Sequence, residues 1–253
     1  MQTALVTGLN GRLAPHLKLA LESAGIDVVR FNRDELAIDN KEQQAEFIAS
    51  HQIDCIFHLA TGPESWLATL ASIAFENDIP FLFTSTESVF NPNSRGPFTP
   101  EHPADATSDY GRYKINCEET ALQANPNTII ARLGWQMFDT FEQDNLLTHV
   151  RDMHDEKGYL NASVRWIPAV AFVDHTMQCL LDLMDAEEPG VYHVGGNESG
   201  LSFYDIACLI ADKFELDWDI REGDDPSRDG RIVDERVPCG DIADALSFDD
   251  FDD

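Results

Sequence analysis

The sequence predicts a doubly wound α/β fold, in which helices cover both faces of a parallel sheet. Short, almost uninterrupted apolar runs recur along the first half of the chain, as expected of strands that are buried on both faces. Between these runs lie segments of ten or more residues with apolar side chains at helical spacing. Such segments are the connections that parallel strands require.

The elements follow in order from the N-terminus. TALVTG is an apolar run that ends in glycine, and residues 12–24 carry apolar side chains at helical spacing before Gly25, which suits a helix end. The pattern of a strand followed by a helix then repeats three times. The strand DVVRFN precedes a helix over residues 41–51, DCIFHLA precedes one over 66–77, and PFLFTST precedes one over 108–124. A fifth strand follows at NTIIARLG.

The alternation loosens beyond Gly134. The sequence predicts, in order, a polar helix over residues 143–153, the extended segment YLNASVRWIPAVAF, a helix over 174–184, a strand at GVYHVGG and a helix over 202–214. We expect a first domain of residues 1–135, to which residues 169–195 return, and a small second lobe of residues 136–168 and 196–253. The acidic end, DDFDD, is expected to be frayed.

The composition excludes several classes of protein. The net charge of −29, from 46 acidic and 17 basic residues, repels nucleic acid and anionic lipid. No apolar run approaches the roughly 20 residues needed to span a bilayer, and no secretory signal is visible. Five scattered cysteines without a CxxC pair indicate neither a disulfide framework nor a zinc site. We therefore expect a cytoplasmic protein with reduced thiols and without a nucleic-acid or membrane partner.

A glycine-containing turn joins the first predicted strand to the first helix. Gly8 permits a tight turn, and Gly11 lets the backbone approach a pyrophosphate at the helix N-terminus. The same pattern also fits a plain glycine turn. Its place at the first strand–helix junction favours a Rossmann-type dinucleotide site, in which Gly8, Asn10, Gly11, Arg12 and Leu13 contact the cofactor. The first domain would then hold the dinucleotide, and the second lobe would bind the substrate.

The end of the second strand bears on the choice of cofactor. An acid about 20 residues after the glycine turn usually binds the ribose hydroxyls of NAD. Here the strand ends Phe31-Asn32-Arg33, with no acid before Asp34. Because Arg33 suits a 2′-phosphate, the sequence favours NADP(H), and Asn32 and Arg33 are both expected to contact the cofactor. NAD(H) stays an alternative, since Arg33 also fits a solvated loop.

Two residues of the helix predicted over 108–124 suggest acid–base chemistry. Tyr110 and Lys114 are four residues apart and therefore share a face. A nearby ammonium stabilises phenolate and lowers the tyrosine pKa, so Tyr110 is the predicted proton donor to a substrate carbonyl and Lys114 is its electrostatic partner. Tyr113 points elsewhere on the helix. The alternative is a chance pair on a helix surface.

The strand PFLFTST supports the catalytic interpretation. It ends in the three hydroxyl residues Thr84, Ser85 and Thr86, at the sheet edge where a ligand is expected. One of these hydroxyls would hydrogen-bond the reacting carbonyl and align it for hydride transfer.

In their order, the motifs VTGLNGRLA, VVRFNRDEL, STESVF, YGRYK, RLGWQMF and GVYHVGG resemble those of the extended short-chain dehydrogenase/reductases. The dTDP-4-dehydrorhamnose reductase branch is the most similar. This resemblance implies that Thr86, Tyr110 and Lys114 form a catalytic triad and that Ser85 and the Ala60-Thr61 turn line the cofactor. It also implies that Glu87 and Trp135 lie on the side of a sugar substrate.

Several positions depart from the pattern of that branch. Ala37 stands where an Asp usually meets the adenine, and Ala162-Ser163 stand where an Asp-Gln pair is usual ahead of Pro168. The expected function is reduction of a keto group on a nucleotide-linked or related sugar. The alternatives are a non-catalytic NAD(P)-binding regulatory subunit and an NAD-dependent sugar-nucleotide epimerase or dehydratase. A homodimer is also left open.

The remaining aromatic and histidine residues suggest structural roles. His149 and His154 are five residues apart and do not match a metal-binding spacing, so no metal is expected. His58 and His193 lie within apolar strands and are expected to make local hydrogen bonds. The residues Trp66, Trp166 and Trp218 are expected to pack in the interior.

Overall fold

The computed structural model describes residues 1–141 and 145–247 and divides into two compact units. The first contains residues 1–89, 104–132 and 177–192, and the second contains residues 90–103, 133–176 and those from 193 onward. The sequence analysis had assigned residues 90–103 to the first domain. They belong to the second unit because the backbone of Phe98 bonds there, donating to Arg231 O at 2.8 Å and accepting from Val233 N at 2.9 Å.

A six-stranded sheet forms the centre of the first unit, in the order β10-β5-β4-β3-β1-β2. Its strands are β1 (Thr3–Thr7), β2 (Asp27–Arg30), β3 (Cys55–His58), β4 (Phe81–Thr86), β5 (Ile129–Leu133) and β10 (Gly190–Val194). Strand β1 runs parallel to both β2 and β3, with Leu5 opposite Val29 and Ile56. From β1 the sheet grows to one side through β2, and from β3 it grows to the other side through β4, β5 and β10, so the direction of strand addition reverses between β1 and β3. The predicted doubly wound parallel sheet is confirmed.

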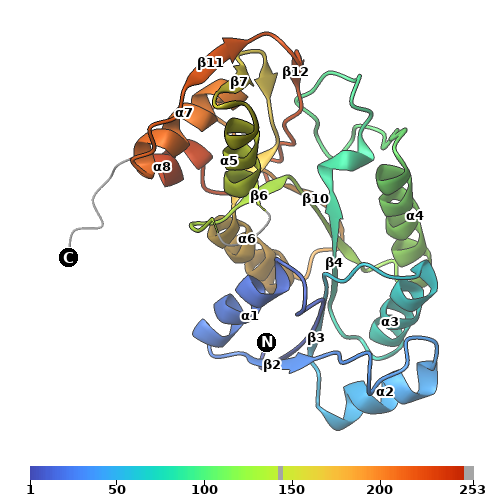
Figure 1. Cartoon of the computed structure of the whole chain (residues 1–253). Helices are drawn as coiled ribbons and strands as arrows, with labels where there is room; N and C mark the ends of the chain where they lie inside the picture. Colours follow the sequence, from blue (N-terminus) through green and yellow to red (C-terminus); the bar gives the residue numbers. More distant parts are fainter. Residues whose placement is uncertain (142–144, 248–253) are drawn as a thin grey trace. The chain divides into compact units, whose positions relative to one another are not determined.

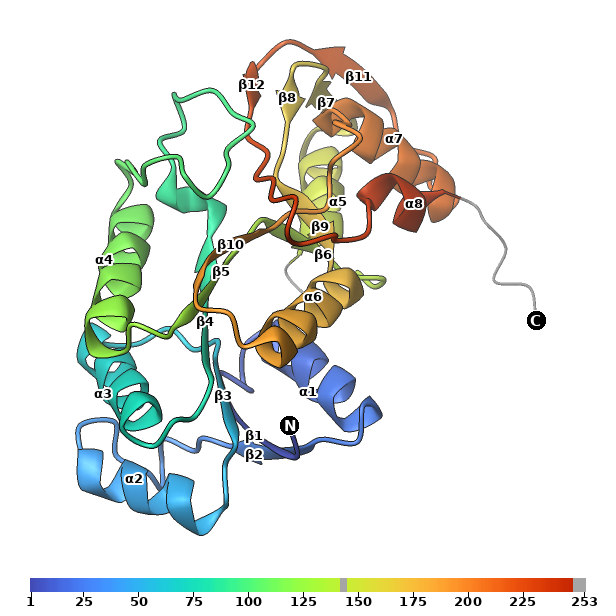
Figure 2. The same cartoon turned by 180° about the vertical axis from the view of Figure 1, so that it is seen from behind.

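Helices cover both faces of this sheet (Figures 1 and 2). Helix α1 (Ala14–Ser23) and the part of α6 (Val173–Ala186) from residue 177 lie on one face, and α3 (Glu64–Glu76) and α4 (Asp109–Ala124) lie on the other. Helix α2 (Lys41–Ser50) packs against α3, and a single 3-10 turn, η1 (Glu87–Val89), follows β4. The main core fills the space under α3 and α4, with Trp66, Phe81 and Phe83 among its largest buried side chains.

Polar caps set where two of these helices begin. The side chain of Asn40 accepts a bond from Gln43 N at 3.0 Å ahead of α2, and Ser108 Oγ accepts from Gly111 N at 3.1 Å ahead of α4. Each cap satisfies an amide that has no partner within its helix. Both helices start within a residue of the predicted position.

Within the described residues, the second unit contains short parallel strand pairs, the first residues of α6 and three further helices. Its strands are β6 (Trp135–Met137), β7 (Leu160–Ser163), β8 (Trp166–Ile167), β9 (Val170–Phe172), β11 (Ile220–Gly223) and β12 (Arg228–Asp229), paired as β11 with β7, β12 with β8, and β6 with β9. Its helices are α5 (Leu146–Lys157), α7 (Phe203–Lys213) and α8 (Ile242–Leu246). They enclose a separate apolar core that includes Leu147, Phe203 and Ile206.

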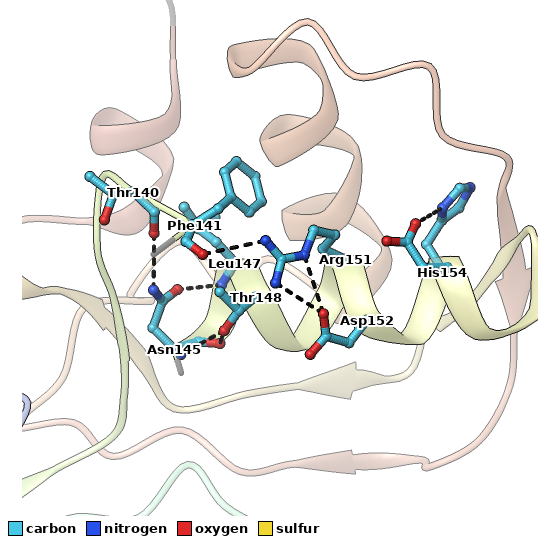
Figure 3. A network of polar contacts seen from close by, with 9 residues as sticks. Thr140, Phe141, Asn145, Leu147, Thr148, Arg151, Asp152 and His154 are labelled. Carbon is cyan, nitrogen blue, oxygen red and sulfur yellow. Dashed lines mark hydrogen bonds and ion pairs between the residues drawn. The ribbon is translucent and has the colours of Figure 1, made fainter. Parts of the chain in front are cut away.

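Helix α5 begins at a polar cap and ends at a glycine. Asn145 Oδ1 accepts from Leu147 N at 2.7 Å, while Asn145 N donates to Thr148 Oγ1 at 2.8 Å (Figure 3). The predicted start at residue 143 lies outside the described residues, as does the acidic end DDFDD. The predicted end at residue 153 is wrong, since the helix continues to Lys157 before Gly158 adopts a left-handed conformation.

Among the described residues, no helix combines the length and the apolar character needed to cross a membrane.

Candidate active site

The glycine turn after β1 packs closely against the turn after β3. Gly8 has a φ of +85°, and a Cβ atom on it would lie 3.0 Å from the backbone nitrogen of Ala60. Gly11 N donates to Gly8 O at 2.7 Å, which closes the turn. Strands β1 and β3 flank the point where the strand order reverses, which is where open α/β sheets bind their ligands. Both the positive φ angle of Gly8 and this close approach favour glycine at position 8, as predicted.

A cavity of about 130 Å³ lies at this turn. Five of its lining residues were predicted to contact the cofactor, namely Gly8, Asn10, Asn32, Arg33 and Ala60. The other lining residues are Leu9, Arg30, Phe31, Asp34 and Trp66. Four further predicted cofactor residues, Gly11, Arg12, Leu13 and Thr61, do not line this cavity. At the start of α1 the N-cap residue Leu13 makes no side-chain capping bond, which suits an anion beside the helix.

Two arginines line this cavity. Arg30 Nη2 donates to Asn10 Oδ1 at 2.9 Å and so links the end of β2 to the glycine turn. The guanidinium of Arg33 lies over the ring of Trp66, 5.8 Å from its centroid. Arg30 was not among the predicted cofactor residues. Its position as the last residue of β2, at the carboxyl edge of the sheet, was the available signal.

The three predicted catalytic residues come from β4 and α4. Thr86 ends β4, and Tyr110 and Lys114 lie on the first turns of α4. A Cβ atom on Gly111 would collide with Ser88 O, so glycine allows the start of α4 to approach the segment after β4. Tyr110 is 51% exposed, and the side chain of Thr86 is near enough to its hydroxyl to act on its pKa. Thr86 and Tyr110 are therefore brought together as the resemblance implied.

Lys114 makes different contacts from those the sequence analysis predicted. Its side chain is buried, Nζ donates to Thr84 O at 2.9 Å, and the ammonium lies 4.7 Å from the ring centroid of Phe83. Burial lowers the pKa of Lys114, and the nearby Cys117 and Glu118 act to raise it.

The pKa of Tyr110 shifts in the direction opposite to the predicted one. Burial raises it above its ordinary value, the hydrogen bond with Thr86 acts to lower it, and the Glu87 carboxylate acts to raise it. Lys114 is not among the causes of this shift, and its ammonium donates to a backbone carbonyl of β4.

Beneath these residues lies a buried polar network that joins three elements of the first unit. Ser85 Oγ donates to Glu118 Oε1 at 2.5 Å, and Arg132 donates to the two oxygens of Glu118 at 2.9 and 2.7 Å. All three residues are 5% exposed. Ser85 was predicted to line the cofactor. Its hydroxyl is instead bound to Glu118, and Ser85 does not line the cavity at Gly8.

The two predicted substrate-side residues belong to different units. Glu87 is half-buried in the first unit, where its carboxylate accepts from Ser88 Oγ at 3.0 Å. Trp135 starts β6 in the second unit and is 36% exposed. The rings of His149 and Trp166 meet Trp135 edge-on, with centroids 5.4 and 5.7 Å away.

The predicted local roles of two histidines are confirmed. His58 Nδ1 lies 3.2 Å from Thr7 Oγ1, and His193 Nδ1 lies 3.0 Å from Phe98 O. Burial lowers the pKa of His58 to about 3, so this imidazole is neutral at pH 7. Within residues 1–141 and 145–247, no group of three or more His, Cys, Asp or Glu side chains is arranged to hold a metal ion.

The fold and the glycine turn define a Rossmann-type dinucleotide-binding architecture. Residues 64–225 match the model of the RmlD substrate binding domain. The chain belongs to this family, that of the dTDP-4-dehydrorhamnose reductase-like sugar-nucleotide reductases.

Two curated relatives are similar over most of the chain. The spore coat polysaccharide biosynthesis protein SpsK of Bacillus subtilis is 23% identical over 233 residues, which cover 86% of this chain and 81% of the relative. The probable low-salt glycan biosynthesis reductase Agl14 of Haloferax volcanii is 23% identical over 239 residues, covering 78% and 75%.

Solved structures share the fold. The dTDP-4-dehydrorhamnose reductase of Bacillus anthracis, solved with NADP, has a TM-score of 0.82 at 16% identity and covers 97% of this chain and 98% of its own. The reductase from Clostridium acetobutylicum has a TM-score of 0.78 at 19% identity, covering 95% and 94%. At these identities the likeness concerns the fold.

Proposed function

We propose that this protein is an NADPH-dependent reductase that acts on a keto group of a nucleotide-linked or related sugar. The observation that carries the proposal is the close approach of the start of α4, which carries Tyr110, to the segment that follows Thr86 at the end of β4, in the same unit as the glycine-turn cavity. The residues lining the cavity at Gly8 would hold a dinucleotide, which when bound would be the source of the hydride for the carbonyl carbon. The Tyr110 hydroxyl donates its proton to the carbonyl oxygen, and the Thr86 hydroxyl aligns that oxygen.

The raised pKa of Tyr110 agrees with the direction of this reaction. A group that must give up a proton has to hold it at the working pH, and Tyr110 is protonated at neutral pH. Lys114, fixed by Thr84 O, would hold the ribose next to the nicotinamide through its remaining N–H groups.

Removing the proton donor tests the proposed reaction. Tyr110→Phe is expected to lower kcat by about 10²- to 10⁴-fold, because the ring is kept and only the acidic hydroxyl is lost. The measurement is NADPH oxidation with a panel of 4-keto sugar nucleotides. Tyr192→Phe is the matched control, since it removes a hydroxyl that donates to Glu188 O at 3.0 Å. A Tyr110→Phe enzyme as fast as wild type would rule out this acid.

The two arginines of the cavity support a preference for NADPH over NADH. A 2′-phosphate is a dianion that guanidinium groups bind through charge-assisted hydrogen bonds. Arg30 and Arg33 line the cavity together with one acid, Asp34, so two positive charges stand against one negative charge there.

Neutralising these arginines should weaken NADPH binding selectively. Arg33→Ala and Arg30→Ala are each expected to raise the Kd of NADPH roughly tenfold or more and to change the Kd of NADH little. Calorimetric titration of both cofactors measures the effect. Arg165→Ala is the control, because its partner, Asp224, lies in the second unit. Equal losses for the two cofactors would argue against 2′-phosphate recognition.

One observation favours a second candidate, a dinucleotide-binding regulatory subunit. Ser163 occupies a position where the family usually has a residue of the substrate-side Asp-Gln pair. Its hydroxyl is bonded to the backbone and not free for a substrate, since it donates to Pro226 O at 2.6 Å and accepts from Arg165 N and Trp166 N at 3.1 Å. This candidate predicts NADPH binding without turnover of any keto sugar, together with a stable complex with another enzyme in a pull-down. An epimerase or dehydratase would instead release tightly held nicotinamide when freshly denatured.

The proposed location of the protein is the cytoplasm. All five cysteines are present as thiols, which suits the reducing cytoplasm.

A homodimer is the proposed alternative to a monomer, and light scattering of the purified protein distinguishes them.

A further inference from the structure

The four-residue turn after β3, residues 59–62, is fixed at its first end by a threonine. Thr7 Oγ1 accepts hydrogen bonds from Leu59 N and Ala60 N, both at 3.1 Å. Thr7 is fully buried and directly precedes Gly8. The start of the turn is therefore joined to the glycine turn, and Ala60 lines the cavity beside it.

The other end of the turn is bound by a tyrosine from α4. Tyr113 OH donates to Gly62 O at 2.7 Å and accepts from Gly62 N at 3.2 Å. One hydroxyl thus satisfies both backbone polar groups of Gly62. Burial raises the pKa of Tyr113 to about 12, so the hydroxyl keeps its proton and both bonds at neutral pH.

Side-chain packing leaves the turn little room at this end. A Cβ atom on Gly62 would lie 2.8 Å from Cε3 of Trp66, which is itself buried under the turn. The ring of Tyr113 packs against the same apolar core as Trp66. The hydroxyl of Tyr113 is therefore held at a fixed position relative to Gly62.

We propose that Tyr113 is a positioning residue that clamps the 59–62 turn and so maintains the dinucleotide cavity in its binding-competent shape. The inference rests on the proposed function in taking NADPH as the ligand. Tyr113 lies between Tyr110 and Lys114 on α4, so the clamp also connects the cofactor turn to the helix that carries the proposed acid.

The physical effect of the clamp is on the population of the competent turn. Without the hydroxyl, Gly62 loses the partners of two backbone groups, and the turn gains alternative conformations in which water satisfies them. The apparent affinity for a ligand falls by the fraction of molecules that remain competent. Because Ala60 is in contact with Gly8, a shift of the turn changes the wall of the cavity.

Tyr113→Phe tests the clamp by removing one oxygen and keeping the ring. We expect faster amide hydrogen exchange at Thr61 and Gly62 in the protein without ligand, and a roughly tenfold higher Kd for NADPH by calorimetry. In the active enzyme the KM for NADPH should rise while kcat stays within about twofold. Unchanged exchange at Gly62, or an unchanged Kd, would overturn the proposal.

Two controls separate this test from other effects. Tyr192→Phe removes a hydroxyl of similar bonding and should leave both the exchange at residues 59–62 and the Kd at wild-type values. In wild type, NADPH should slow exchange at the same amides, and its failure to do so would also count against the clamp. A wild-type protein that binds NADPH but reduces no keto sugar refutes the proposed reaction, while the exchange and binding measurements still decide the role of Tyr113.

Discussion

The hydroxyl groups of Tyr110 and Tyr113 lie three residues apart on α4 and have different partners. Tyr110 is half-exposed and meets a side chain, Thr86, whereas Tyr113 meets the backbone of Gly62. Burial raises the pKa of both phenols, so both keep their protons at neutral pH. Exposure separates their roles, because only a hydroxyl that a substrate can reach serves as a proton donor.

His58 should make the stability of the protein depend on pH in the acidic range. Its pKa is about 3 in the folded state and ordinarily 6.5. Between these values the unfolded chain binds a proton that the folded chain does not. The contribution of neutral His58 to the free energy of unfolding is therefore complete above the ordinary pKa. It falls as the pH falls below that value, by up to about 1.4 kcal/mol per pH unit.

A neutral substitution isolates this effect. We expect His58→Gln to be less stable than wild type at about pH 7.5 and the difference to shrink as pH falls towards about 5, measured by urea unfolding. A difference that stays constant with pH would show that His58 accepts a proton equally well in both states.

A contact could be predicted from the sequence only where its two residues lie close together along the chain. The glycine turn is local, so the roles of Gly8 and Asn10 at the cavity could be anticipated. The bonds from Tyr113 to Gly62 and from Lys114 to Thr84 connect residues 51 and 30 positions apart, and no spacing rule relates such positions. The predicted direction of the Tyr110 pKa failed for this reason, since Thr84 O holds the ammonium.

At the scale of elements, α4 is joined to the sheet by successive residues on one face. Tyr110, Lys114 and Glu118 are spaced by four; Lys114 and Glu118 bond Thr84 and Ser85 of β4, and Thr86 acts on the pKa of Tyr110. Arg132 on β5 completes the last contact. This arrangement fixes both the rotation and the translation of α4 relative to the strands.

Breaking the buried ion pair should destabilise the first unit. Glu118→Gln leaves the guanidinium of Arg132 buried without a countercharge, which typically costs about 3–5 kcal/mol of unfolding free energy. Urea unfolding measures the loss. Glu22→Gln is the matched control, because the pair of Lys18 and Glu22 is exposed and contributes about 0–1 kcal/mol. Similar losses in the two variants would mean that the buried pair has no special role.

The elements that the sequence predicted well are those with a strong period. Strands β1 to β5 and helices α1 to α4 carry regular apolar patterns and were found close to their predicted bounds. The short elements β11, β12 and α8 were not predicted, because stretches of two to five residues carry too little periodicity. Their positions depend on partners elsewhere in the chain, as for β11, which pairs with β7 about 60 residues earlier.

At the scale of the whole molecule, the net charge of −29 should make stability depend on salt. Like charges repel more strongly in the compact state, and added salt shortens the range of that repulsion from about 10 Å at 0.1 M to about 3 Å at 1 M. We expect the thermal midpoint to rise between about 0.05 M and about 1 M KCl. The control is NaCl at equal ionic strength, which should act alike, and a midpoint that falls with either salt would contradict the prediction.

The same surplus of carboxylates affects how ligands arrive. NADPH and sugar nucleotides are anions, so at long range the protein repels the molecules that it is proposed to bind. Arg30 and Arg33 act on such a ligand only over the last few ångströms, inside the cavity at the glycine turn. Diffusional encounter should therefore be slow in dilute buffer and faster in brine, the reverse of the usual behaviour of a cationic site on a neutral protein.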